Sequence, residues 1–251
     1  IKLREGVKFH DGTEMKASDV VYSIQYLGDS SYGGNYSFDY DNVKAVDDYT
    51  VELPTVGVIG PLEDQMCSVY VFSQANTEAQ GENVGQNMVA TGPFKQGEWV
   101  SGDYLILDRF DDYWGGPAAI RQITMRFIAE SSVAGIELES GGIDLNLNVS
   151  STDYNRIQNG EIDGYNTYTG AMITVNFVQF NCTNITDARV RQAVAYAMDR
   201  QAILDSVYEG VGELSWSMFA PGTLGYDSSY AEEKAYDYNP EKAKELLAEA
   251  G

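Results

Sequence analysis

The sequence has few of the residues that most catalytic sites require. Histidine occurs once in 251 residues, at His10. A Ser-His-Asp hydrolase needs a histidine as its general base, and no Gly-x-Ser-x-Gly motif is present. Asp11-Gly12 follows His10 and is typical of a turn, so we expect the imidazole to hydrogen-bond locally rather than to act in catalysis or metal binding. We therefore predict a protein that is not an enzyme, with no catalytic residue, no metal ligands and no cofactor.

Cysteine is also scarce, with Cys67 and Cys182 alone in the chain. Two cysteines cannot form a disulfide framework, and the sequence has no Cys-x-x-Cys pair for a metal or redox site. A single bridge requires a geometry that sequence cannot establish. We expect two free thiols.

Long apolar runs are missing, as is a signal segment. No stretch reaches the roughly 18 apolar residues of a membrane-spanning helix. The chain opens on Ile1-Lys-Leu-Arg4 without an initiator methionine, and we expect it to be a piece of a longer protein.

The chain also has few positively charged residues. Lysine and arginine together number 16 against 38 acidic residues, which gives a formal net charge of −22. Such a field repels phosphate backbones and anionic lipid headgroups, so we expect no nucleic-acid partner. Solubility explains the acidity most simply, and attraction of cationic ligands is the alternative. The chain is 43% hydrophobic and 12% aromatic, enough for a substantial core.

Periodicity and turn residues predict a mixed α/β fold. We expect helices from about Ala17 to Leu27 with Ser18 or Asp19 in the capping turn, through Val133–Leu138, at Asp187–Glu209 with Thr186 as N-cap, and from Asn239-Pro240 to Gly251. We expect strands on both sides of Asp47-Asp48, at Phe94–Val100, Tyr104–Arg109, Ile123–Ile128 and Met172–Phe180. Gly28–Tyr36 and Gln80–Asn87 read as loops.

Two features indicate ligand contact rather than chemistry. Eighteen tyrosines are present, some of them in the polar loops Tyr32–Tyr40 and Tyr165–Tyr168. Tyrosine offers a flat apolar face and a hydroxyl, which suits a ligand cleft, although half-buried surface aromatics are equally common. Asn146 and Asn148 would point to one side of an extended segment, where their amides could bind a ligand's main chain or the protein's own loops.

Seven segments, taken in order, resemble one family. They are Leu3–Gly12, Ala17–Ile24, Ala90–Phe94, Asp112–Gly116, Ser140–Asp144, Asp187–Arg200 and Asn239–Gly251. Together they are similar to the solute-binding proteins of bacterial peptide-type ABC importers, the oligopeptide, dipeptide and nickel-binding group. Lys16 departs from the family's capping threonine, and Gly142 departs from its glutamate.

The resemblance implies a periplasmic-binding-protein-like fold whose two lobes close on the ligand, with an extra subdomain on the first lobe. Residues 1–88 would form most of that subdomain, 89–170 part of the first lobe, and 171–251 the start of the second lobe. The chain would cross the hinge near Gly170 to Met172.

The resemblance also implies a function. The protein would be the extracytoplasmic component of an ABC importer, periplasmic or lipid-anchored, monomeric, delivering a peptide-like solute to a membrane permease. The predicted ligand-binding residues are Asn148, Asn146, Tyr36, Tyr32, Thr91 and Asn181, the last two chosen for nearness to the hinge. The alternatives are an acidic secreted hydrolase and a surface interaction protein without a transport role.

Overall fold

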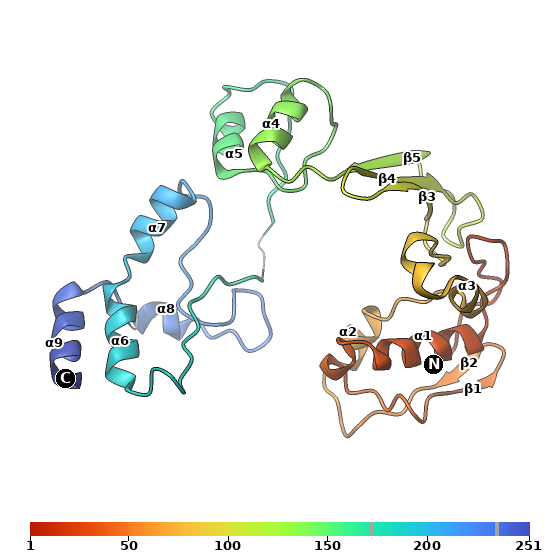
Figure 1. Cartoon of the computed structure of the whole chain (residues 1–251), viewed down its shortest axis with the longest axis horizontal. Helices are drawn as coiled ribbons and strands as arrows, with labels where there is room; N and C mark the ends of the chain where they lie inside the picture. Colours follow the sequence, from red (N-terminus) through yellow and green to blue (C-terminus); the bar gives the residue numbers. More distant parts are fainter. Residues whose placement is uncertain (171–172, 234–235) are drawn as a thin grey trace. The chain divides into compact units, whose positions relative to one another are not determined.

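The structure, a computed structural model, describes residues 1–170, 173–233 and 236–251 (Figure 1). The chain divides into two compact units, Ile1–Ile128 and Ala129–Gly251, each with its own elements. The lobe and subdomain boundaries expected at residues 88 and 170 stay predictions.

The first unit begins with a helix packed on a small hairpin. Helix α1 (Ala17–Asp29) contacts β1 (Lys44–Asp47) and β2 (Thr50–Glu52), which pair antiparallel as expected (Figure 1). Lys16 occupies the N-cap position, and its backbone N–H donates to Oδ2 of Asp19 at 3.0 Å. The predicted first-turn role of Asp19 is therefore confirmed, and the lysine at the N-cap is accommodated because the carboxylate satisfies the free N–H.

A contiguous apolar core lies between this helix and the hairpin. It also takes in the segment before the helix, including Phe9, which is 1% exposed. Its buried members are Val7, Phe9, Met15, Ala17, Val20, Ile24, Val43 and Val51. Burial of these side chains is the main stabilising term in this part of the chain.

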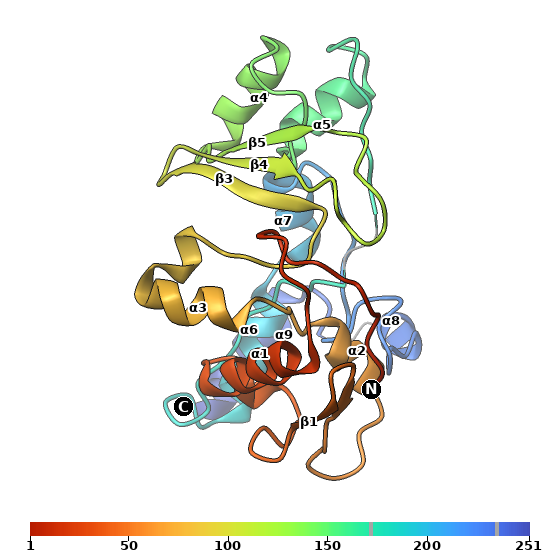
Figure 2. The same cartoon turned by 90° about the vertical axis from the view of Figure 1, so that its right-hand side faces the viewer.

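A three-stranded antiparallel sheet follows in the same unit, in the order β3-β4-β5 (Figure 2). Strands β3 (Phe94–Val100) and β4 (Tyr104–Arg109) have the predicted bounds. Strand β5 (Gln122–Arg126) begins one residue earlier and ends two residues earlier than expected. The turn at residues 101–103 contains Gly102 at φ 80°, a conformation that suits glycine.

Sequence reasoning missed four short elements here. They are the 3-10 helices η1 (Gly33–Asn35) and η2 (Gly81–Gln86) and the helices α2 (Leu62–Cys67) and α3 (Gln74–Gln80). The loop expected at Gln80–Asn87 is therefore wrong over most of its length. These turns carry no apolar periodicity because they are too short to show one.

The second unit opens with two helices that are joined by the ion pair between Arg156 and Glu139. Helix α4 (Ser131–Glu139) ends just before Gly141, as predicted. Helix α5 (Ser151–Gln158) was missed, although Ser150 and Asp153 form a recognisable capping pair. The Ser150 Oγ accepts from the Asp153 N–H at 3.0 Å and donates to Asp153 Oδ2 at 2.8 Å.

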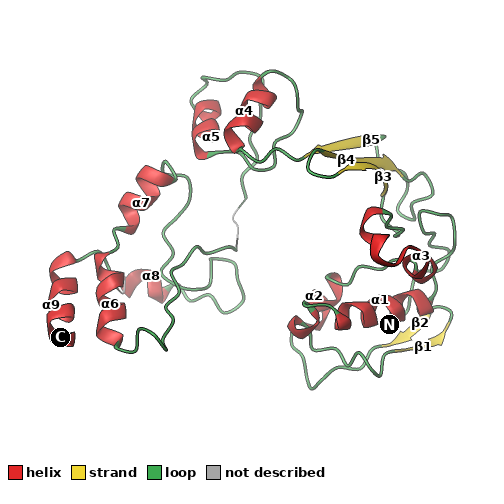
Figure 3. Cartoon of the chain, in the orientation of Figure 1, coloured by secondary structure: helices red, strands yellow, loops and turns green. Residues whose placement is uncertain are grey.

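The long helix predicted at Asp187–Glu209 is wrong as a single element. The structure has α6 (Ala188–Ala197) and α7 (Arg200–Val207), shown in red in Figure 3. Asp199 interrupts the helix because its Oδ1 accepts from the Ala202 N–H at 2.9 Å and starts a new helix. Asp187, not Thr186, caps α6, and a hydrogen bond from Arg189 lowers the pKa of Asp187 to about 2.

The remaining helices are α8 (Ser229–Glu233) and α9 (Pro240–Ala250). Helix α9 begins after Asn239 as predicted, with Asn239 Oδ1 accepting from the Lys242 N–H at 3.0 Å. It packs against α6 around a small core of Ala193, Ala243 and Leu246 (Figure 3).

The strand predicted at Met172–Phe180 is not observed. Met172 lies outside the described residues, and residues 173–180 have no regular structure. Phe177 and Val178 are each 57% exposed rather than buried. β-Branched and aromatic residues favour a strand where a neighbouring strand pairs with them, and none of the described residues pairs with this segment.

Candidate ligand-binding site

The loop between α4 and α5 carries the two predicted asparagines. The Asn146 side-chain oxygen accepts from the Asn148 N–H at 3.0 Å, which folds the loop into a local turn. Asn148 is exposed, and within the described part of the chain its side-chain amide has no hydrogen-bond partner. Leu145 and Leu147, on either side of Asn146, are 69% and 84% exposed. The loop thus presents a free amide beside apolar side chains.

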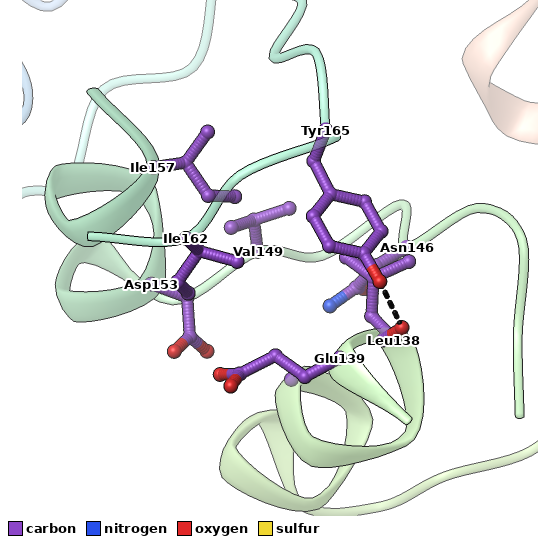
Figure 4. A pocket seen from close by; sticks show the side chains of 9 residues that line it. Leu138, Glu139, Asn146, Val149, Asp153, Ile157, Ile162 and Tyr165 are labelled. Atoms are coloured by element: carbon purple, nitrogen blue, oxygen red, sulfur yellow. Dashed lines mark hydrogen bonds between the residues drawn. The ribbon is translucent and has the colours of Figure 1, made fainter. Parts of the chain in front are cut away.

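Asn146 also faces inward, toward a small cavity between α4 and α5 (Figure 4). Its Nδ2 atom is buried and has no partner among the described residues. The cavity has a volume of about 10 Å³ and is lined by apolar side chains such as Val149, Ile157 and Ile162. This is the space of one water molecule, so the cavity itself cannot hold a solute.

Two contacts hold α5 and the following segment against α4, and a third, within α5, holds Arg156 in place. The Tyr165 hydroxyl donates to the Leu138 carbonyl at 2.6 Å (Figure 4). Arg156 pairs with Glu139 at 2.7 Å and with Asp153 at 3.3 Å. The hydrogen bond to Glu139 is the main cause of the raised pKa of Arg156. The asparagine loop is therefore supported from both of its flanking helices.

The tyrosine-rich loop of the first unit is also ordered by its own side chains. Tyr36 stacks on Phe38 with ring centroids 5.6 Å apart, and the Tyr40 hydroxyl donates to the Gly33 carbonyl at 2.9 Å. Burial raises the pKa of Tyr40. Tyr32 is 67% exposed and available for contact, whereas Tyr36 is half-buried against Phe38.

Thr91 lies in a segment that His10 holds in place. The His10 Nδ1 atom accepts from the Ala90 N–H at 3.3 Å, and Nε2 lies 3.1 Å from the Gly92 carbonyl. This pattern requires the neutral ring with its proton on Nε2. Burial lowers the pKa of His10. The expected local hydrogen bonding of the imidazole is therefore wrong, since its partners lie about 80 residues away.

A polar cleft of about 560 Å³ lies beside this histidine, and sequence reasoning did not find it. Lys95 and Arg109 from the sheet and Asn76 from α3 are among its lining residues. The Asn76 Oδ1 atom is buried without a partner among the described residues. No sequence pattern links these positions, because the sheet and α3 meet only in the fold.

Asn181 forms a turn in the second unit. Its Oδ1 atom accepts from the Thr183 N–H at 2.9 Å and, more weakly, from the Asn184 N–H at 3.4 Å. The side chain is exposed, and its oxygen is engaged in this turn.

The first unit therefore holds Tyr32, Tyr36 and Thr91, and the second holds the three asparagines. Within the second unit the structure brings Asn146 and Asn148 together. Across residues 1–170, 173–233 and 236–251, no cluster of three or more histidine, cysteine or acidic side chains has the arrangement of a metal site. In the same ranges no helix combines the length and apolar character needed to cross a membrane.

Curated proteins that match this chain over its whole length are named as binding proteins. The oligopeptide-binding protein AppA of Bacillus subtilis is 30% identical over 265 residues, which covers 100% of this chain and 48% of AppA. The dipeptide-binding protein of Escherichia coli is 28% identical over 99% of this chain and 51% of its own length. The chain thus spans about half the length of the curated relatives it matches. These relatives are named for binding, not for catalysis.

Solved structures show the same fold. AppA of Bacillus subtilis in complex with a nonapeptide superimposes with a TM-score of 0.80 at 28% identity, covering 100% of this chain and 51% of that protein. A peptide-binding protein AppA from Clostridium difficile gives a TM-score of 0.84 at 25% identity, with 100% and 54% covered. The predicted α/β, periplasmic-binding-protein-like fold is confirmed.

A family model supports the same assignment. The model for bacterial extracellular solute-binding proteins, family 5 middle, matches residues 1–251. The resemblance drawn from seven short segments is thereby confirmed over the full length of the sequence. This chain belongs to family 5 of the bacterial extracellular solute-binding proteins.

Proposed function

We propose that the protein is the solute-binding component of an ABC importer and captures a peptide-like ligand. The observation that carries the proposal is the family match over residues 1–251, joined by relatives named for binding oligopeptides and dipeptides. Such a protein binds its ligand without turnover and passes it to a membrane permease.

The loop at Leu145–Val149 supports a peptide as the ligand class. An unpaired amide at Asn148 offers both a donor and an acceptor, which matches the main-chain groups of a peptide. The exposed Leu145 and Leu147 side chains offer apolar contact at the same place. We propose Asn148 as the principal contact and Asn146 as a weaker one, since the oxygen of Asn146 is already engaged. Tyr32, Tyr36, Thr91 and Asn181 complete the proposed set.

The proposed mechanism is closure of two lobes around the ligand by a hinge motion. The chain would pass from the first lobe to the second near residue 170; Met172, also assigned to this crossing, lies outside the described residues. The closed form is what the permease would recognise.

The partners follow from this role. We propose a monomer that works outside the cytoplasmic membrane, periplasmic or held at the outer face by a lipid anchor. Its partners would be the solute and an ABC permease. Extraction of the protein from membranes by detergent, but not by salt, would support the anchor.

Mass spectrometry of material released from the purified full-length protein tests the ligand class. We expect short peptides or peptide-like solutes, and isothermal calorimetry should then show saturable binding of the same compounds. Hydrolysis of generic ester or peptide substrates, or a complete lack of peptide binding, would contradict the proposal.

Replacing Asn148 by alanine tests the proposed contact. We expect binding to weaken by about 1–2 kcal/mol, because a ligand amide loses its hydrogen-bond partner inside the complex. Asn83→Ala is a matched control, since Asn83 is also an exposed asparagine but belongs to η2. Normal binding by Asn148→Ala would remove this residue from the site while leaving the binding function intact.

A further inference from the structure

Glu209 joins two helices that are far apart in the sequence. Its carboxylate accepts a hydrogen bond from the Thr152 hydroxyl and lies 3.4 Å from Asn155 Nδ2. The same Nδ2 group donates to the Glu209 backbone carbonyl at 3.2 Å. Thr152 lies in the first turn of α5 and Asn155 near its middle, and Glu209 follows the end of α7. One residue thus links both helices through its side chain and its backbone.

The backbone of Glu209 makes this contact unusual. Its φ is 49°, in the left-handed region that few residues other than glycine adopt. Gly210 N–H donates to the Leu204 carbonyl at 3.0 Å, so the chain turns back onto the last turns of α7. Gly210, the next residue, is also left-handed at φ 77°, and glycine is the usual residue in this conformation after a helix. A glutamate there costs local stability that the bonds to α5 offset.

These contacts bear on the asparagine loop because of where α5 begins. Asn148 lies three residues before the first residue of α5, Ser151, and Ser150 between them caps the helix. Fixing the first half of α5 therefore restrains the end of the loop that carries Asn148. Helix α5 is also held to α4 by the ion pair between Arg156 and Glu139.

We infer that Glu209 is a positioning residue for the ligand-binding loop. It ties α5 to α7, holds Asn148 in place and so strengthens ligand binding without touching the ligand. The inference rests on the proposed function, in which Asn148 contacts the solute.

Three substitutions distinguish the contribution of the Glu209 side chain from that of its left-handed backbone. Glu209→Gly removes the side-chain contacts with Thr152 and Asn155, keeps the backbone carbonyl that accepts from Asn155, and relieves the left-handed backbone, so the end of α7 itself should not weaken. Glu209→Asn tolerates the same backbone but is too short to reach Thr152. Glu209→Gln keeps the length and an acceptor oxygen, and should restore most of the effect. Glu213→Asn is the control, because Glu213 is a nearby exposed carboxylate with no partner in the described part of the chain.

Two measurements on the full-length protein test the inference. Amide hydrogen exchange without ligand should show faster exchange of residues 146–153 in Glu209→Gly and Glu209→Asn, and near-normal exchange in Glu209→Gln and Glu213→Asn. Calorimetry with a peptide ligand should show binding about 3- to 5-fold weaker in the first two variants. Thr152→Ala should add little to Glu209→Gly, because both remove the hydrogen bond between these two side chains.

Unchanged exchange at residues 146–153 in Glu209→Gly and Glu209→Asn would overturn the inference, as would a Glu209→Gln variant as impaired as Glu209→Gly. The exchange measurement needs no ligand. If Asn148→Ala binds normally, the proposed contact fails, and the exchange data still decide whether Glu209 restrains the loop.

Discussion

The two units differ in how they are stabilised. The first buries large apolar side chains such as Phe9, Ile24 and Val51, each no more than 2% exposed. The buried cluster described in the second consists of Ala193, Ala243 and Leu246, and its other buried apolar residues, Ala134 and Ala220, are also small. Its helices depend more on polar caps and on ion pairs such as Arg156–Glu139. The first unit therefore resembles an ordinary globular core, and the second resembles a set of helices joined by polar contacts.

This difference explains which helices and strands could be predicted from the sequence. Helix α1 and the β3–β4 hairpin were predicted because their signals are local: apolar spacing, a first-turn aspartate and a turn glycine. The segment at 173–180 has the composition of a strand but no pairing partner in the described ranges, and composition cannot supply one. Strand predictions therefore succeeded where the partner strand was close in sequence.

The largest expected effect compares the two cores directly. Phe9→Ala should lower the free energy of unfolding by about 3–5 kcal/mol, because it leaves a large cavity in a closed core. Leu246→Ala should cost less than Phe9→Ala, since Leu246 borders a small, more open core and the site can relax. Urea denaturation of both variants checks the order, with Val58→Ala at an exposed position as control. Equal losses of unfolding free energy in Phe9→Ala and Leu246→Ala would contradict the proposed difference between the two cores.

A second test concerns close packing in the first unit. A Cβ atom on Gly28 would lie 2.6 Å from Cγ of the Tyr40 ring, which is held by its bond to Gly33. Gly28→Ala should therefore destabilise by about 1–3 kcal/mol, although alanine favours a helix more than glycine does. Gly85→Ala is the matched control, because its Cβ would meet nothing within 4 Å. A thermal melt that shows Gly28→Ala as stable as the control would mean that Tyr40 moves aside freely.

The candidate site shows a similar division between what the sequence reveals and what it does not. The Asn146-x-Asn148 pair was visible as a pattern, and its local turn is a short-range interaction. Asp199 and the Ser150–Asp153 pair are also local signals. Both have the residue types of helix N-caps, so the starts of α7 and α5 are predictable from the sequence. Other contacts join segments that are distant in the sequence, so only the folded structure reveals them. These are the hydrogen bonds of His10 with Ala90 and Gly92 and those of Glu209 with α5.

Acid should weaken the first unit through His10. In the folded state its pKa lies below the ordinary value of 6.5, mainly because of burial. The unfolded chain therefore binds the proton more readily, and the stability that the neutral ring contributes is intact above 6.5 and is lost as the pH falls toward the folded pKa. His10→Ala should cost roughly 1–3 kcal/mol near neutral pH, because the Ala90 N–H and the Gly92 carbonyl lose their partner.

Melting temperatures of the parent and His10→Ala proteins, measured from about pH 8 to about pH 5, test this prediction. The gap between them should narrow toward low pH, where the parent loses the contribution of His10. We also expect His10→Ala to retain ligand binding when the protein is folded, since the imidazole has a structural role. A constant gap across the range would show that His10 does not titrate with unfolding.

The smallest expected effect uses the thiols, one in each unit. Cys67 and Cys182 are both free and exposed in the structure. Intact-mass analysis after alkylation without reductant should therefore show two adducts, and Cys67→Ser and Cys182→Ser should leave the melting temperature unchanged. Exposed positions without packing partners contribute within about 0.5 kcal/mol. A protein that takes up no adduct would indicate a disulfide between Cys67 and Cys182. The two units would then be covalently linked and would not be stabilised independently of each other.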